Sequence, residues 1–178
     1  MHICHRFQPR LIFKQARQKT NGWFKRRTPL IAFVFGVFLL FAASNTALAI
    51  KCNIRGTVGI NFGTYDVFNA TPTDSTGSIT YRCRQVNGDP VLITLSRGSA
   101  TSYNPRQMQS GAYVQQYNLY LDAAHSNIWG DGTEGTTYYQ TIPPKNSNVT
   151  VTIYGRIPPG QDIPAGNYLD TIVATVQW

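Results

Sequence analysis

The sequence predicts an all-β fold, a β-sandwich of about six or seven strands. Three observations support this prediction. Apolar and polar residues alternate through most of residues 50–178, turn-rich segments separate the alternating stretches, and no stretch of ten residues there has a helical repeat. Period-2 alternation is typical of half-buried strands. The region is also rich in Thr, Tyr, Val and Ile, which favour strands over helices.

The first strands are expected between residues 52 and 95. A loop of Asn, Thr, Pro, Asp, Ser and Gly at 69–77 separates the first strand from the second, and the Asn-Gly-Asp-Pro turn at 87–90 precedes the third. Such residues favour turns because they supply the backbone angles that turns require. The inward faces are expected to carry Cys52, Ile54, Val58, Ile60 and Phe62, then Ile79, Tyr81 and Cys83, then Val91, Ile93 and Leu95.

The later strands follow the same pattern. Residues 97–111 are polar and glycine-bearing and are expected to be irregular, while 127–135 and 156–166 read as turns. The last strand is expected to alternate up to residue 178. The inward sets are Tyr117, Leu119 and Leu121, then Val149, Val151 and Ile153, then Ile172, Ala174, Val176 and Trp178.

The start of the chain has the layout of a secretory signal peptide. Residues 1–29 carry eight Lys or Arg and no acidic residue, an apolar run covers 30–43, and Ala47-Leu48-Ala49 follows. This order predicts a signal peptide at 1–49 and one exported domain at 50–178. The apolar run is shorter than the roughly 20 residues of a membrane span. An uncleaved N-terminal anchor is the alternative, because the basic cluster at 25–27 suits that topology.

The charge distribution removes one class of function. The whole chain has a formal net charge of +8, but residues 50–178 hold eight basic and eight acidic side chains. A nucleic-acid-binding domain needs a basic surface. The exported domain is therefore expected to bind no nucleic acid and, after signal cleavage, no membrane.

Two of the three cysteines fall in the exported domain. Cys4 lies in the leader, whereas Cys52 and Cys83 remain as an even pair. In an exported protein such a pair predicts one disulfide. No close C-x-x-C arrangement is present that would favour a redox site.

The sequence offers no assembled catalytic or metal site. His125 is the single histidine after the leader, and its nearness in sequence to Asp122 and Ser126 does not establish a triad. Asp131 and Glu134 lie among glycines and are candidates for calcium, but the fuller spacing of an EF-hand loop is missing. We therefore expect a protein that is not an enzyme, with no catalytic residue, metal or cofactor.

Several short segments together resemble the spore coat protein U domain, the fold shared by pilin subunits of archaic chaperone–usher pili. Their order and spacing carry the resemblance, which covers nearly the whole exported domain. The segments are NFGTYD at 61–66, ITYRC at 79–83, LSRG at 95–98, RQM at 106–108, YNLYLD at 117–122, IWGDG at 128–132, YGRIP at 154–158 and GNYLDT at 166–171.

The resemblance implies an immunoglobulin-like sandwich that lacks its last strand and is completed by a donor strand. A periplasmic chaperone would fill the resulting groove first, and another pilus subunit would replace it, with an outer-membrane usher in the pathway. Main-chain hydrogen bonds give affinity in this kind of strand addition, and alternate side chains give specificity. The residues expected to border the groove are Val58, Ile60, Phe62, Ile172, Ala174, Val176 and Trp178.

The region before the first domain cysteine departs from a polymerising pilin. Cleavage after Ala49 leaves only Ile50 and Lys51 ahead of Cys52, which is far too short for a donor arm at about 3.3 Å per residue. The subunit is therefore expected to accept a strand without offering one. That places it at a pilus tip or makes it a non-polymerising relative, in adhesion or biofilm formation.

A second interpretation remains open from the sequence. The chain can be a secreted coat or carbohydrate-binding module that works without an usher. Its ligand would meet loops on the sandwich, since binding residues often lie on loops. The candidate loop residues are Tyr103, Trp129 and Asp131. Both interpretations predict export through the periplasm to the cell surface or the medium.

Overall fold

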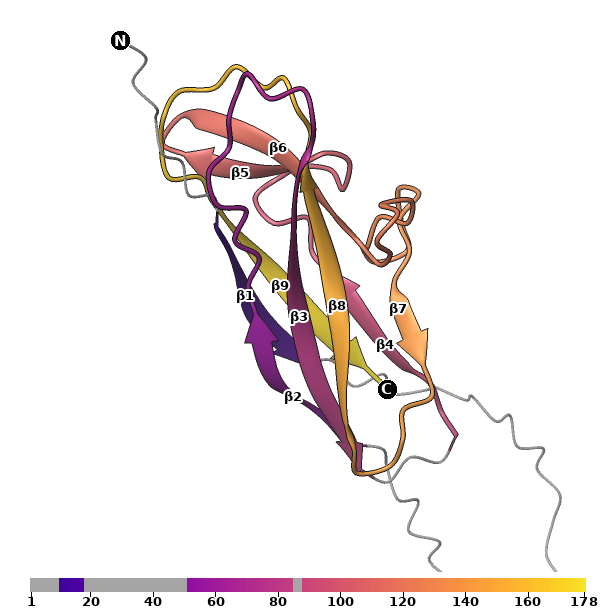
Figure 1. Cartoon of the computed structure of the whole chain (residues 1–178). Coiled ribbons are helices and arrows are strands. Elements are labelled where there is room, and N and C mark those ends of the chain that lie inside the picture. The colour runs from indigo at the N-terminus through magenta and orange to yellow at the C-terminus, as the bar shows by residue number, and fades with distance from the viewer. Residues whose placement is uncertain (1–9, 18–50, 85–87) are drawn as a thin grey trace, which may run out of the picture.

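The computed structural model describes residues 10–17, 51–84 and 88–178, with the side chains of 15–17 left out. Within these residues the chain forms nine β-strands and no helix (Figure 1). In this described part of the chain, no helix is therefore long and apolar enough to cross a membrane. The strands are β1 Arg10–Arg17, β2 Lys51–Val58, β3 Thr73–Arg84, β4 Val91–Leu95, β5 Arg106–Ser110, β6 Tyr113–Tyr120, β7 Tyr139–Thr141, β8 Asn148–Ile157 and β9 Leu169–Gln177.

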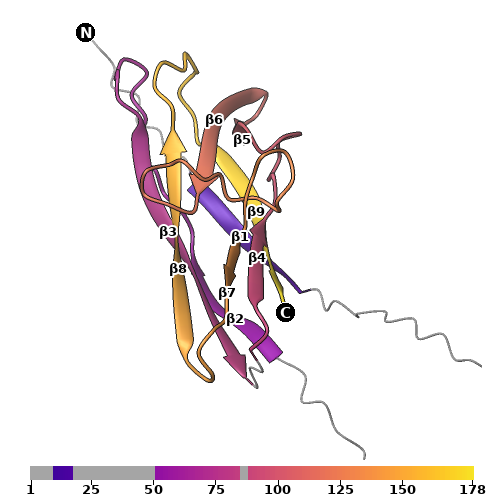
Figure 2. The ribbon, with the colours of Figure 1, turned by 90° about the vertical axis from the view of Figure 1, so that its right-hand side faces the viewer.

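The strands form two layers joined through β6. The first layer has the order β2-β3-β8, and the second has β5, β9, β4 and β7, with β1 on the other side of β9. Residues 113–117 of β6 pair with β5, while 118–120 pair with β8 in the other layer. Figures 1 and 2 show the elongated sandwich that results. The all-β sandwich prediction is confirmed.

The apolar residues of the alternating pattern fill the space between the two layers. In β3 the buried residues are Gly77, Ile79, Tyr81 and Cys83, and in β9 they recur at every second position. Full burial of such an apolar side chain contributes about 1.5–3 kcal/mol. Two short strands were not predicted. β5 lies in the segment expected to be irregular, and β7 is three residues long.

One predicted core position is wrong because β2 contains a bulge. Ile54 pairs with Tyr81 but Gly56 pairs with Thr80, so Arg55 is the extra residue. An extra residue reverses which face later side chains point to. Val58, expected on the inner face, therefore lies opposite Ser78 and is 62% exposed.

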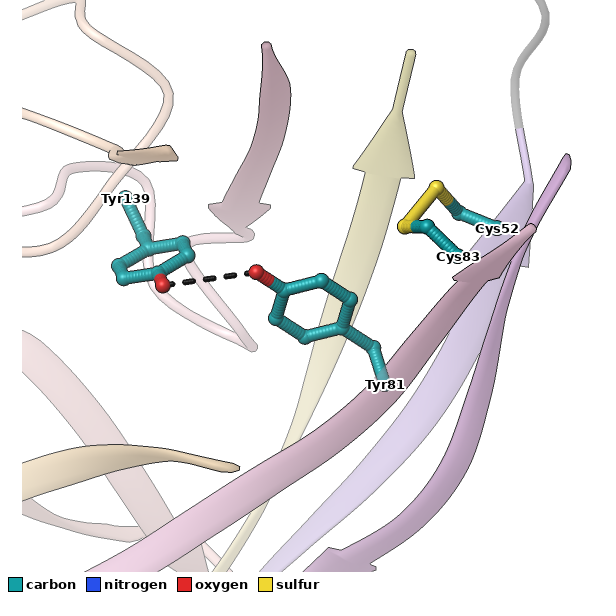
Figure 3. The surroundings of a disulfide bond; sticks show 4 residues. All are labelled: Cys52, Tyr81, Cys83 and Tyr139. Atoms are coloured by element: carbon teal, nitrogen blue, oxygen red, sulfur yellow. Dashed lines mark hydrogen bonds between the residues drawn. A yellow bond between two sulfur atoms is a disulfide. The ribbon is translucent and has the colours of Figure 1, made fainter. Parts of the chain in front are cut away.

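The predicted disulfide is present and joins directly paired residues. Cys52 near the start of β2 lies opposite Cys83 near the end of β3, with their Cα atoms 4.1 Å apart (Figure 3). Both side chains are fully buried. Beside them the Tyr81 and Tyr139 hydroxyls are 3.4 Å apart in a hydrogen bond, which links the two layers. The disulfide thus fixes one end of the sandwich.

We expect that replacing both Cys52 and Cys83 by alanine lowers the free energy of unfolding by about 3–4 kcal/mol, because the bond closes a loop with a sequence separation of 31. Urea denaturation of the oxidised chain measures this difference. Cys4→Ser is the matched control and should leave the midpoint unchanged. An equal midpoint for the double variant and the wild type would contradict the expectation.

Candidate strand-accepting groove

The candidate site is the outer edge of β9. One side of β9 pairs with β4 and, at Leu169, with β5. Its other side pairs with β1, and within residues 51–84 and 88–178 no strand takes that place. β1 runs parallel to β9, with Leu11 opposite Asp170 and Phe13 opposite Ile172. Figures 1 and 2 show β1 lying along β9, although the two strands come from opposite ends of the chain.

Main-chain hydrogen bonds hold the start of β1 between the two layers. The Arg10 amide donates to the Tyr168 carbonyl oxygen at 3.0 Å, on the β9 side. The next amide, of Leu11, donates to the Ile60 carbonyl oxygen at 2.9 Å, on the β2 side. A strand held in this way satisfies backbone groups on both of its edges.

The side chains of β1 alternate as those of an inserted strand do. Leu11 is 1% exposed and belongs to the core, while Ile12 is 50% exposed. Phe13 is half-buried against the core, and Lys14 is exposed. Leu11 and Phe13 therefore enter the groove while Ile12 and Lys14 face outward, which is the pattern that gives specificity in strand addition.

Most residues predicted to border the groove lie in the same core as Leu11. Ile60, Phe62 and the three β9 residues are buried together in one cluster, and Trp178 packs against it. Val58 is the exception, because of the bulge described above. A role of these residues in strand exchange remains a prediction. The β9 members are Ile172, Ala174 and Val176.

β1 does not close the sandwich along its whole length. It meets the β2 side through a bridge between Arg10 and Asn61, just beyond the end of β2. A partly open cavity of about 430 Å³ lies between the strands, lined by Ile12, Phe13 and residues 57–59 among others. In the described part of the chain, β1 is thus paired with β9 along its length but with the β2 side only at its start.

The aromatic residues predicted for a binding loop are not available to a ligand. Trp129 is fully buried, and its indole N–H donates to the Ile93 carbonyl oxygen at 2.8 Å. Tyr103 is 3% exposed. Its burial, together with a hydrogen bond to Asp131, raises the pKa of Tyr103 to about 12. Both rings are packed into the protein, whereas Asp131 is exposed, so Asp131 is the one candidate loop residue that is open to a ligand.

Arg106 is the central member of a buried polar cluster that the sequence did not indicate. Its guanidinium donates to the carbonyl oxygens of Ser96 at 3.0 Å and Trp129 at 2.6 Å, and to Asn118 Oδ1 at 2.8 Å. The Arg106 guanidinium also lies 5.1 Å from the centroid of the Tyr103 ring. Burial lowers the pKa of Arg106, because it removes the charged group from water. The cluster ties the loops at 96–105 and 121–138 to strand β6 and the core.

Next to this cluster, Asp170 anchors the start of β9. Its carboxylate accepts hydrogen bonds from the Tyr117 hydroxyl at 2.6 Å and from the Ser99 amide at 2.9 Å. Burial, followed by the charge of Asp170, raises the pKa of Tyr117 well above its usual value. Because Asp170 is the register partner of Leu11, these contacts position the groove where β1 enters it.

The histidine considered in the sequence forms no triad. His125 Nε2 lies 3.8 Å from Asp74 Oδ1, and the His125 side chain is 8% exposed. Ser126 instead donates its hydroxyl to Asp122 Oδ1 at 3.0 Å, which closes the loop. Across the described residues, no group of three His, Cys, Asp or Glu side chains is placed to hold a metal ion.

Comparison with known proteins agrees with the resemblance seen in the sequence. The family model for the Spore Coat Protein U domain matches residues 38–175. The chain belongs to the Spore Coat Protein U family. This is a family of structural, non-enzymatic proteins.

Protein U of Myxococcus xanthus is 34% identical over 141 residues, which cover 70% of this chain and 76% of Protein U. Among solved structures, the chaperone–tip adhesion subunit pre-assembly complex of archaic chaperone–usher Csu pili from Acinetobacter baumannii contains a similar chain. It has a TM-score of 0.48 and 21% identity over 73% of this chain, and the match spans 40% of that chain's length.

We expect Arg106→Met to lower the free energy of unfolding by about 3 kcal/mol, because the Ser96 and Trp129 carbonyl oxygens lose a buried donor. Urea denaturation of the oxidised chain measures the loss. Arg97→Met is the control, since Arg97 is 40% exposed in its ion pair with Glu134 and such a pair contributes at most about 1 kcal/mol. Equal losses for the two variants would show that Arg106 is not the centre of the cluster.

Proposed function

We propose that this protein is a non-enzymatic subunit of a cell-surface pilus of the chaperone–usher type, assembled by donor-strand complementation. A periplasmic chaperone supplies a strand to the outer edge of β9, and another pilus subunit later replaces that strand at the usher. The protein is exported by cleavage of residues 1–49 and acts in adhesion or biofilm formation.

The seating of β1 is the single observation that carries this proposal. The domain matched by the family model begins at residue 38, and β1 lies outside it at residues 10–17. A segment from outside the matched domain thus pairs with the outer edge of β9, which is the place that a donated strand would take. Once residues 1–49 are removed, the edge of β9 exposes unpaired main-chain groups, and such an edge invites a strand from another chain.

The short stretch before Cys52 supports a terminal place for the subunit. β2 begins at Lys51, so cleavage after Ala49 leaves no segment that reaches another subunit's groove. A chain that accepts a strand without donating one ends a fibre or stays outside it. We therefore propose a tip or non-polymerising subunit, with partners limited to the chaperone, the usher and one neighbouring subunit.

Disruption of the usher gene in the source organism tests this proposal. We expect the tagged full chain to occur in the surface material released by shearing, together with other subunits, and to be lost from it without the usher. Loss of the chaperone gene should also remove the protein from the periplasm, because a subunit with an open groove aggregates or is degraded. The crystal-violet assay of biofilm measures the adhesive role in the same strains.

Two substitutions on β9 connect this experiment to the groove. Ala174 is fully buried on the groove side, whereas its neighbour Thr175 is only half-buried. We expect Ala174→Asp to abolish surface assembly and Thr175→Asp to retain it, with disulfide formation checked in both. A protein released as a soluble monomer in equal amount with and without the chaperone and usher would instead indicate a secreted coat or surface-binding module.

A further inference from the structure

Gly59 lies where β1 comes closest to the backbone of the β2 side. A Cβ atom added to Gly59 would be 2.3 Å from the Leu11 carbonyl oxygen. Real Cβ atoms do not come closer than about 3.0 Å to such a neighbour without displacing it. The contact is with a main-chain atom, which cannot turn away as the end of a flexible side chain can.

The surrounding contacts prevent β1 from shifting to make room. The Leu11 amide donates a hydrogen bond to the carbonyl oxygen of Ile60, the residue after Gly59, and the Leu11 side chain is 1% exposed. On the β9 side, the Arg10 amide donates a hydrogen bond to the Tyr168 carbonyl oxygen. Moving the Leu11 carbonyl by an ångström would therefore lengthen hydrogen bonds or open the core around Leu11.

The backbone conformation at position 59 does not itself require glycine. Gly59 does not have the positive φ that disfavours other residues, unlike Gly63 at +73°. Alanine at position 59 thus changes only the space beside β1. Gly56, in the preceding strand β2, also lacks a positive φ and would meet nothing within 4 Å of an added Cβ. It offers a matched control.

We propose that Gly59 is the position that admits a strand into the groove beside β9. The occupant in the full chain is its own segment Arg10–Arg17. Because Gly59 meets a main-chain carbonyl, it acts on any strand in this register, whatever the side chains of that strand. Its extension to a strand from a chaperone or another subunit rests on the proposed function; its action on β1 does not.

Hydrogen exchange of the Leu11 amide in the oxidised full chain tests the proposal, with Cys4→Ser as background. The amide is expected to be protected in the wild type, because it donates to the Ile60 carbonyl oxygen. We expect Gly59→Ala to reduce its protection about tenfold or more, since forced overpacking favours the opened state. Gly56→Ala should keep the wild-type value within about twofold.

Amides of β3 and β8 report whether the rest of the sandwich is intact. Their protection should be equal in all three proteins. A Leu11 amide that is unprotected in the wild type, or equally protected in Gly59→Ala, overturns the proposal. Since no chaperone or usher is present, failure of the pilus assignment leaves this result unaffected, and the reverse also holds.

Discussion

The pairing of the outer edge of β9 is the constraint on which the rest of the structure depends. β9 contributes Ile172, Ala174 and Val176 to the core, and its inner edge is already paired with β4 and β5. Its outer edge must pair with a strand or expose main-chain donors and acceptors beside apolar residues. In the full chain β1 meets this need, running parallel to β9 from a segment that precedes the domain.

The remaining parts of the molecule hold that edge in place from two ends. The disulfide fixes the start of β2 to the end of β3, whereas Asn61, which bridges to Arg10, lies beyond the other end of β2. At that second end Asp170 and the Arg106 cluster fix the start of β9 and the loops around it. A groove held at both ends keeps its shape, so a strand entering it finds a preformed site, which lowers the cost of ordering on binding.

Local patterns were sufficient for most strands of residues 51–178 but not for β1, β5 and β7 or for features set by distant contacts. Alternation identified the buried faces of β3, β4, β8 and β9, and the cysteine count identified the disulfide. The bulge at Arg55 cannot be recognised from the alternation of apolar and polar residues. It reverses the face to which the following side chains point, so the predicted inward position of Val58 was wrong. The burial of Trp129 and Arg106 depends on segments far away in sequence, which a local pattern does not report. β1 carries three consecutive apolar residues within a basic leader, which gives no strand signal.

We propose that residues 50–178 form a domain that lacks one strand and is stabilised when a strand is supplied. The most direct measurement is thermal unfolding of the leader-cleaved protein, isolated from the periplasm, with and without a synthetic peptide of residues 10–17. We expect saturating peptide to raise the unfolding midpoint, since a ligand present at about 100 times its Kd adds about 2.7 kcal/mol to stability. A peptide with Leu11→Asp should have no effect. An unchanged midpoint with the wild-type peptide, in a protein that is already a stable monomer, would contradict the claim.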